Sequence, residues 1–202
     1  LQSISMSESV ANIDSFAFLL CPNLSKIEAS PNNRRYSSKE DGALYSKSGD
    51  TLFLVPKKTA AFTIPNTVKC IGDEAFAFCD SLRSIVIPNS VTSIGNKAFT
   101  CCHNLQSVVI PNSVTSIKWC TFLNCTNLQS VVIPNSVTSI GEFAFNGCAN
   151  LQNVVIPNSV TSIRAFAFAY CRRLQSIVIP NSVTNIGRSA FGDAVLQTFT
   201  IE

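Results

Sequence analysis

The nine cysteines are the first residues in this 202-residue chain that could carry chemistry, because thiols form disulfides and bind metal ions. Five of them recur at one constant interval, at Cys79, Cys102, Cys125, Cys148 and Cys171, and Cys21 occupies the equivalent place in an earlier unit. The chain has no Cys-x-x-Cys pair, and Cys70, Cys101 and Cys120 fall outside the regular column. This spacing predicts a structural column of side chains rather than a metal site.

The only histidine, His103, offers the one imidazole for acid–base chemistry. Asp80 precedes it by the same interval that separates the regular cysteines, so we expect the two to lie side by side as a surface pair. A base and an acid without a matched nucleophile do not form a catalytic set. The chain also lacks the glycine-rich, zinc-binding and nucleophile motifs of common enzymes. We therefore predict that the protein is not an enzyme and has no catalytic residue, no metal site and no cofactor.

The composition excludes several classes of protein and partner. Hydrophobic residues make up 46% and charged residues 13%, which excludes a disordered chain. The net charge of +3 is too small to predict nucleic acid or anionic lipid as the main partner. The longest apolar run, residues 165–171, is far shorter than the roughly 20 residues of a membrane span, so no membrane insertion is expected.

A repeated segment organises almost the whole chain. The motif Ile-Pro-Asn-Ser-Val-Thr begins at Ile87, Ile110, Ile133, Ile156 and Ile179, so the starting number rises by a constant step of 23. Related sequence gives units that start at residues 6, 64, 87, 110, 133, 156 and 179, with one interruption at 29–63. A unit of this length cannot bury its own apolar face, so the repeats predict a single solenoid domain over 1–202.

The pattern within a unit predicts its local structure, with positions numbered 1 to 23 from the isoleucine of the motif. Leucine at position 19, isoleucine or valine at position 22 and isoleucine at position 1 are spaced as the inward residues of a strand, and proline at position 2 ends it. Alanine, phenylalanine and cysteine at positions 12, 13 and 16 share one face of a helical wheel. We therefore expect each unit to contain one strand and one short helical turn.

The segments 105–117 and 141–148 resemble the BspA-like, or treponemal-type, leucine-rich repeat. The resemblance implies a leucine-rich-repeat solenoid with a parallel sheet on one face, short helical turns on the other and one β-hairpin insert. It also implies a non-catalytic, adhesin-type module at the cell surface or secreted, binding proteins of a host or partner cell. An intracellular scaffold or passive spacer is the alternative, because secreted proteins usually oxidise their thiols.

The interruption at 29–63 resembles the hairpin insert of that family. Residues 43–45 and 51–55 favour strands, and Asp41-Gly42 and Ser48-Gly49-Asp50 favour turns beside them. The segment also carries six of the 15 basic residues. We expect a solvated, protruding hairpin, with a dedicated binding element as the alternative.

Two columns of the repeat predict the core. The phenylalanines of position 13 are Phe18, Phe76, Phe99, Phe122, Phe145, Phe168 and Phe191. The cysteines of position 16 are Cys21, Cys79, Cys102, Cys125, Cys148 and Cys171. Successive coils of a solenoid lie about 4.8 Å apart, whereas a disulfide needs Cβ atoms about 3.8 Å apart. The cysteine column should therefore hold buried, free thiols.

Outward-facing positions of the strand are the main candidate binding site. Position 23 is valine in five consecutive units: Val86, Val109, Val132, Val155 and Val178. Uncharged residues border it at positions 20 and 21: Gln106, Ser107, Gln129, Ser130, Gln152, Asn153, Gln175 and Ser176. We expect one continuous sheet across at least six units and a protein partner docked on it. The alternative is that valine merely suits a sheet surface and was copied by duplication.

An aromatic patch is the second candidate site. Position 11 holds Phe16, Phe143 and Phe166, and Tyr170 follows one helical turn after Phe166. On an ideal wheel these rings point away from the core and could form a protein contact. A tight 3₁₀-like turn would rotate them inward instead.

The two ends of the repeat array differ from its middle. The chain begins inside a unit, and the last unit has Ala194 where the column requires cysteine. Neither end carries an evident polar cap. We therefore expect a fragment of a longer chain, with end-to-end self-association as a further expectation.

Overall fold

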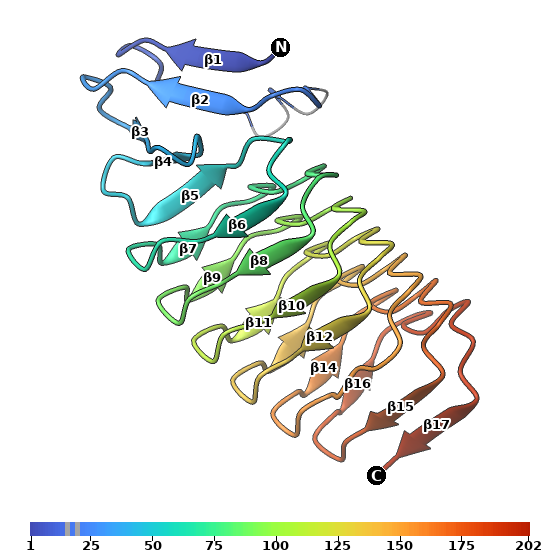
Figure 1. The fold of residues 1–202 in the computed structure, drawn as a ribbon. Helices are drawn as coiled ribbons and strands as arrows, with labels where there is room; N and C mark the ends of the chain where they lie inside the picture. Colours follow the sequence, from blue (N-terminus) through green and yellow to red (C-terminus); the bar gives the residue numbers. More distant parts are fainter. Residues whose placement is uncertain (15–16, 19–20) are drawn as a thin grey trace.

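The chain forms a parallel β-solenoid in which each coil stacks on the one before it (Figure 1). The computed structural model describes residues 1–14, 17–18 and 21–202. Equivalent residues of successive repeats pair directly, as in Ser107 with Ser130 and Ser139 with Ser162. The period of the sequence is therefore the length of one turn of the solenoid.

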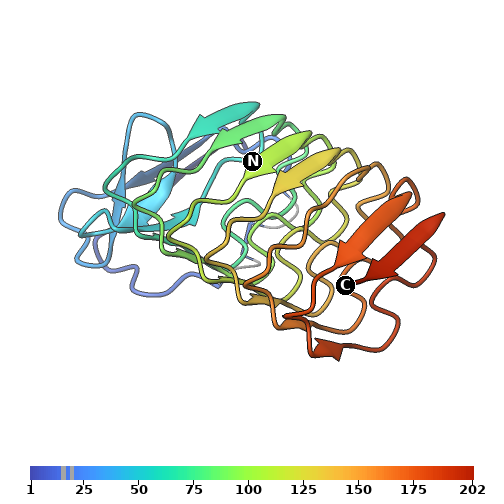
Figure 2. The same cartoon turned by 90° about the horizontal axis from the view of Figure 1, so that it is seen from below.

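One face of the solenoid carries the predicted strands. They are β1 (Ser3–Met6), β2 (Lys26–Ala29), β6 (Ala61–Thr63), β8 (Ser84–Val86), β10 (Ser107–Val109), β12 (Ser130–Val132), β15 (Ser176–Ile179) and β17 (Thr198–Ile201). In β10 and β12 the middle valine is buried and its two neighbours are exposed, the alternation of a sheet with one face in water. We call this side the strand face; Figure 2 shows its arrows along one edge of the solenoid.

A second row of strands lines another side of the coils, and apart from β5 the sequence did not predict it. Its strands are β5 (Thr51–Leu54), β7 (Cys70–Ile71), β9 (Ser93–Ile94), β11 (Ser116–Ile117), β13 (Ser139–Ile140), β14 (Ser162–Ile163) and β16 (Asn185–Ile186). They belong to two sheets: β5, β7 and β9 pair in that order, as do β11, β13, β14 and β16, and no pair joins β9 to β11. From β9 to β14, isoleucine at position 8 is buried while serine at position 7 is partly exposed. Two residues per coil are too few to give a sequence signal for a strand.

The predicted helical turns are wrong, because the described residues contain no helix. Positions 11 and 15 adopt positive φ in every regular coil, as at Phe143 (56°) and Gly147 (73°). The Phe145 N–H donates to the carbonyl of Ala167 in the next coil at 2.8 Å, whereas the Cys148 N–H donates to Phe145 in its own coil at 3.1 Å. Main-chain N–H groups such as that of Phe145, which a helix would pair internally, therefore donate to the next coil instead.

The insert is a hairpin, as predicted, but it does not protrude. Strands β3 (Tyr36–Ser38), β4 (Leu44–Ser46) and β5 pair antiparallel, and β5 then pairs parallel with β7. Tyr45 and Leu52 are fully buried. Within the predicted bounds, β5 pairs with β7 of the next coil, and β6 pairs with β8 on the strand face. Burying apolar side chains against the first full coil explains why the hairpin folds back.

The core is a column of stacked rings. Phe76, Phe99, Phe122, Phe145 and Phe168 are fully buried. Ring centroids of neighbouring pairs lie 4.9–5.2 Å apart along this column. Phe191 extends it at 5.6 Å, whereas Phe18 packs in a separate cluster with Leu24 and Ile27 beyond the insert. The predicted column is therefore confirmed from Phe76 onward and is interrupted before it.

Candidate functional site

The valines of position 23 form a stripe along the strand face, which we call the valine stripe. Their exposed fractions are 58% for Val86, 62% for Val109, 56% for Val132, 78% for Val155 and 46% for Val178. Val109 pairs directly with Val132, so neighbouring side chains stand one strand spacing apart. The stripe is the regular exposed apolar feature of this face.

Uncharged polar side chains border the valine stripe. Gln106, Gln129, Gln152 and Gln175 are exposed, as are the residues of position 21 beside them, Ser107, Ser130, Asn153 and Ser176. Inward-facing neighbours such as Val108 and Val131 are buried and fix the strand orientation. From Val109 to Val178, a partner that covered this border would not need to desolvate a charge, whereas Arg83 stands at position 20 beside Val86.

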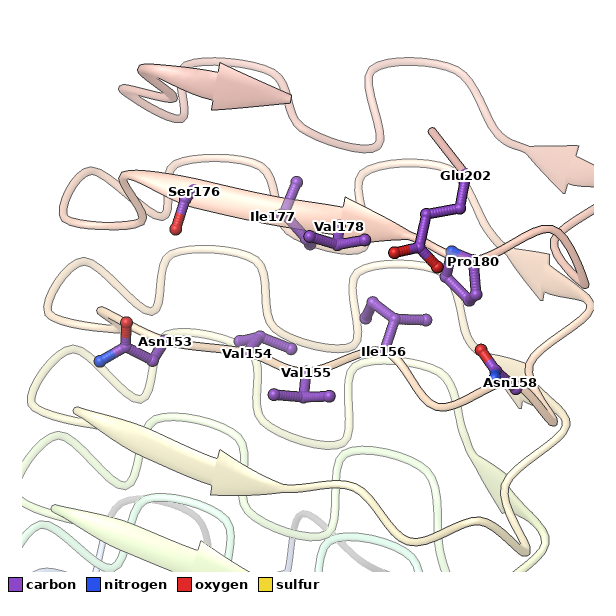
Figure 3. Close-up of a pocket in the computed structure, with 10 residues that line it drawn as sticks. All are labelled: Asn153, Val154, Val155, Ile156, Asn158, Ser176, Ile177, Val178, Pro180 and Glu202. Carbon is purple, nitrogen blue, oxygen red and sulfur yellow. The ribbon is translucent and has the colours of Figure 1, made fainter. Parts of the chain in front are cut away.

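The strand face is not the single continuous sheet that we predicted. The assigned pairs on this face are β1–β2, β6–β8, β10–β12 and β15–β17. One isolated bridge joins Ser130 to Asn153, and residues 152–156 form no strand. A groove with a volume of about 470 Å³ lies between this segment and β15 (Figure 3). Asparagine at position 21 contributes to the break, because it disfavours strands.

The aromatic patch exists, although no helix supports it. The rings of Phe143 and Phe166 are partly exposed and stack at 5.0 Å with an interplanar angle of 4°. Tyr170 is 45% exposed, and all three residues have positive φ. Phe16, the third phenylalanine of this column, lies outside the described residues. The rings therefore stand one above the other at the rim of the turns rather than on a helix face.

The cysteine column consists of free thiols that bond to the main chain. Cys79, Cys102, Cys125, Cys148 and Cys171 are free and buried, whereas Cys21 is partly exposed. Sγ of Cys102 donates to the carbonyl of Phe76 at 3.0 Å, and the next three thiols donate to position 13 of the preceding coil at 3.1–3.2 Å. Burial raises the pKa of the Cys79 thiol to about 11 and that of Cys171 to about 12. These thiols are therefore protonated and unreactive near neutral pH.

His103 and Asp80 form the predicted surface pair. The Nδ1 atom of His103 lies 2.6 Å from Oδ1 of Asp80, and both side chains are exposed. Within the described part of the chain, no group of three or more histidine, cysteine and carboxylate side chains is placed to hold a metal. The same residues include no helix long and apolar enough to cross a bilayer.

Sequence reasoning missed an asparagine ladder beside the strand face. At position 18, the Asn104 amide donates to the carbonyl of Asp80 at 2.7 Å. Asn127 donates to Asn104 at 3.3 Å, and Asn150 donates to Asn127 at 3.0 Å. The signal in the sequence is asparagine in three successive units, followed by Arg173.

The chain is similar to several bacterial proteins of known structure. A leucine-rich-repeat protein from Eubacterium ventriosum matches with 26% identity and a TM-score of 0.76, over 98% of this chain and 60% of that one. A leucine-rich cell surface protein from Faecalibacterium prausnitzii matches with 33% identity and a TM-score of 0.67, over 100% and 48%. The pneumococcal vaccine antigen PcpA shares the fold, with 21% identity and a TM-score of 0.79 over 100% and 56%.

The chain spans about half to three fifths of the length of these proteins. None of the curated proteins matches it significantly. The model of the BspA-type leucine-rich repeat region, in six copies, matches residues 1–40, 46–142 and 92–202. With the repeat register and the solenoid already described, this match shows that the chain belongs to the BspA-type leucine-rich repeat family.

Proposed function

We propose that the chain is a non-catalytic, adhesin-type module that binds a protein of a host or partner cell through the valine stripe. The observation that carries the proposal is the exposure of one valine in each of five coils, at 46–78%. Exposed apolar side chains aligned in this way are typical of an interaction surface. Each coil adds an equivalent contact, so weak interactions accumulate along the stripe.

The polar border supports a protein partner rather than a charged polymer. Between Gln106 and Ser176, positions 20 and 21 hold only glutamine, serine and asparagine. Burying such residues is much less unfavourable than burying unpaired charges, and their amides and hydroxyls can bond to a partner's main chain. A nucleic-acid surface would present lysine and arginine in this place.

A location at the cell surface is part of the proposal. It rests on the family and on the cell-surface description of the Faecalibacterium relative. The free thiols do not favour an intracellular scaffold instead, because burial within the column keeps five of them from solvent oxidants.

The experiment measures binding of the fluorescently labelled chain to cultured epithelial cells by flow cytometry. We expect saturable binding that protease treatment of the cells removes and that Val132→Lys with Val155→Lys abolishes. Thr138→Lys with Thr161→Lys is the matched control, since it places the same two charges at exposed positions on adjacent coils away from the valine stripe. An equal loss of cell binding in both double variants would contradict the proposal. Cell binding that survives protease treatment would contradict it as well.

A further inference from the structure

At position 20, the main-chain ladder of the strand face continues from residue 60 to residue 152 and opens at the next junction between coils. In neighbouring coils, the Gln129 N–H donates to the Gln106 carbonyl at 2.8 Å, and the Gln152 N–H donates to Gln129 at 3.1 Å. The next step would join Gln175 to Gln152. Segments 152–156 and 175–179 are both fully described, yet no main-chain hydrogen bond joins them. The groove lies at this junction.

The same two coils stay closed on their other sides. Strand β14 pairs with both β13 and β16, and the rings of Phe145 and Phe168 stack at the ordinary 5.2 Å. The Cys171 thiol still donates to the Phe145 carbonyl at 3.2 Å. The coils therefore separate as a wedge that opens only at the strand face.

Two departures from the repeat coincide with the opening. Arg173 replaces the asparagine of position 18, so the asparagine ladder ends at Asn150. Asn153 replaces the serine of position 21, and its segment forms no strand. The first change ends the side-chain hydrogen bonds that join neighbouring coils, and the second places a residue that disfavours strands.

One buried hydroxyl of the second coil lacks the hydrogen bond that its column usually makes. Ser136 and Ser159 donate to the carbonyls of Val114 and Val137 in the preceding coil at 2.6 Å and 2.7 Å. The next serine of this column, Ser182, has a buried Oγ without a hydrogen-bond partner. Ser90 also lacks a partner, but there β6 and β8 remain paired. Loss of this bond therefore occurs both where the strands of the face pair and where they do not.

The groove offers both apolar and main-chain contacts. Its base is formed by inward-facing Val154 and Ile177, and its walls carry Val155 and Val178 from the valine stripe (Figure 3). Strand β15 bonds to β17 through the carbonyls of Gln175 and Ile179, so the main-chain groups of Val178 face the other way, toward the groove. An edge of this kind is a template for an added strand.

The ends of the groove differ in charge. A second hollow of about 500 Å³ continues it past Asn153 and Ser176 to Arg173. Glu202 lies at the opposite end, beside Pro180 and Asn158 (Figure 3). Because β15 runs from the arginine end to the glutamate end, an antiparallel strand would bring its carboxyl end to Arg173.

We infer that this groove binds an extended peptide segment of a protein partner, added antiparallel to β15. The segment has small or β-branched residues at alternate positions, an acidic residue at its carboxyl end and a basic residue at its amino end. The inference rests on the proposed function, because it names the form of the partner at the strand face. The two proposals differ in the surface that they use. Peptide binding needs only the groove between two coils, whereas docking on the valine stripe also uses Val109 and Val132.

The probe is the peptide acetyl-Lys-Thr-Val-Thr-Val-Thr-Glu-amide carrying a fluorophore, and binding is measured by fluorescence anisotropy. We expect saturable binding that weakens about tenfold or more when alternate main-chain nitrogens are methylated, because main-chain hydrogen bonds are lost. Exchanging the lysine and glutamate should weaken binding by about threefold to tenfold. Absence of binding, or equal binding of the methylated peptide, would overturn the proposal.

Two double variants test whether the peptide binds in the groove. Asn153→Ser with Arg173→Asn restores the repeat, so it should protect the Gln175 amide from hydrogen exchange and abolish peptide binding. Binding at the wild-type level in this variant would overturn the inference. Val109→Lys with Val132→Lys lies outside the groove, so it should remove cell binding and leave peptide binding unchanged. Loss of peptide binding there would place the probe on the valine stripe and overturn the groove assignment.

Discussion

At the scale of single residues, two columns of side chains hold the solenoid together, and both could be predicted from the sequence. A phenylalanine or cysteine that returns once in every repeat must occupy the same environment in every coil. The hydrogen bonds of the thiols could not be predicted, because they depend on where the carbonyl of the preceding coil points. Asn153 and Arg173 were visible as departures, but their effect depends on contacts with neighbouring coils.

Truncation of a central ring should be strongly destabilising. Phe122 is fully buried between Phe99 and Phe145, with both ring centroids at 5.2 Å. We expect Phe122→Ala to lower the free energy of unfolding by about 3–5 kcal/mol, since it leaves a cavity in a column that cannot collapse. Urea denaturation followed by circular dichroism measures the loss. Phe191→Ala, at a partly exposed ring, should have a smaller effect, and equal effects would contradict the packing account.

The buried thiols predict that the protein loses stability at alkaline pH. Their folded-state pKa lies above the ordinary value of 9.0, at about 11 for Cys79 and about 12 for Cys171. Stabilisation is complete below pH 9 and falls as pH rises toward the folded value, because only the unfolded chain releases the proton. Each thiol contributes a slope of up to about 1.4 kcal/mol per pH unit.

This slope can be checked by urea denaturation at pH 7.5, 9 and 10 under reducing conditions. Cys148→Ala with Cys171→Ala should give a shallower fall with pH than the wild-type chain. The same fall in both proteins would show that the buried thiols are not its cause.

At the scale of elements, the strands of the face were predictable and the turns were not. Leucine, valine and isoleucine at the inward positions, ending at proline, are a local signal, so β10 and β12 lie where expected. The spacing at positions 12, 13 and 16 equally suits a helix, but the N–H group of position 13 donates to the next coil, as Phe145 does to Ala167. The spacing of residues within one repeat does not reveal whether an N–H group bonds inside its own turn or to the next coil. The two-residue strands on the other side of the coils escaped prediction because they are too short to give a periodic signal.

Gly147 lies in a left-handed turn where a side chain would meet the preceding coil. Its φ is 73°, and a Cβ there would lie 2.2 Å from Oδ1 of Asn124. We expect Gly147→Ala to destabilise by about 1–2 kcal/mol, because an L-residue is strained in this conformation and the new methyl group meets the amide. Thermal unfolding measures the change.

Adding Asn124→Ala to Gly147→Ala separates the two causes. The double variant relieves the contact but keeps the strained φ, so the effect of Gly147→Ala should be smaller in that background without vanishing. An unchanged melting temperature in Gly147→Ala would contradict the positive φ assigned to the turn.

At the scale of the whole molecule, stacked coils convert one short sequence into an extended surface. The valine stripe repeats a single exposed residue, and the groove interrupts that repetition at one junction. The stripe was predictable because it follows the period. The groove was not, since it depends on how Arg173 and Asn153 alter the stacking of neighbouring coils. The regular repeat thus forms the proposed binding surface of the valine stripe, and the departures from the repeat accompany the groove.

The most direct test of the account compares the valine stripe with the aromatic patch in one cell-binding assay. Val132→Lys with Val155→Lys should keep the fold, because outward-facing changes alter stability by about 0.5 kcal/mol or less each, and it should abolish binding. Phe143→Ser with Phe166→Ser, checked for folding by circular dichroism, should bind as the wild-type chain does. Normal binding by the valine double variant, together with loss of binding in the phenylalanine double variant, would contradict the account and assign binding to the turns.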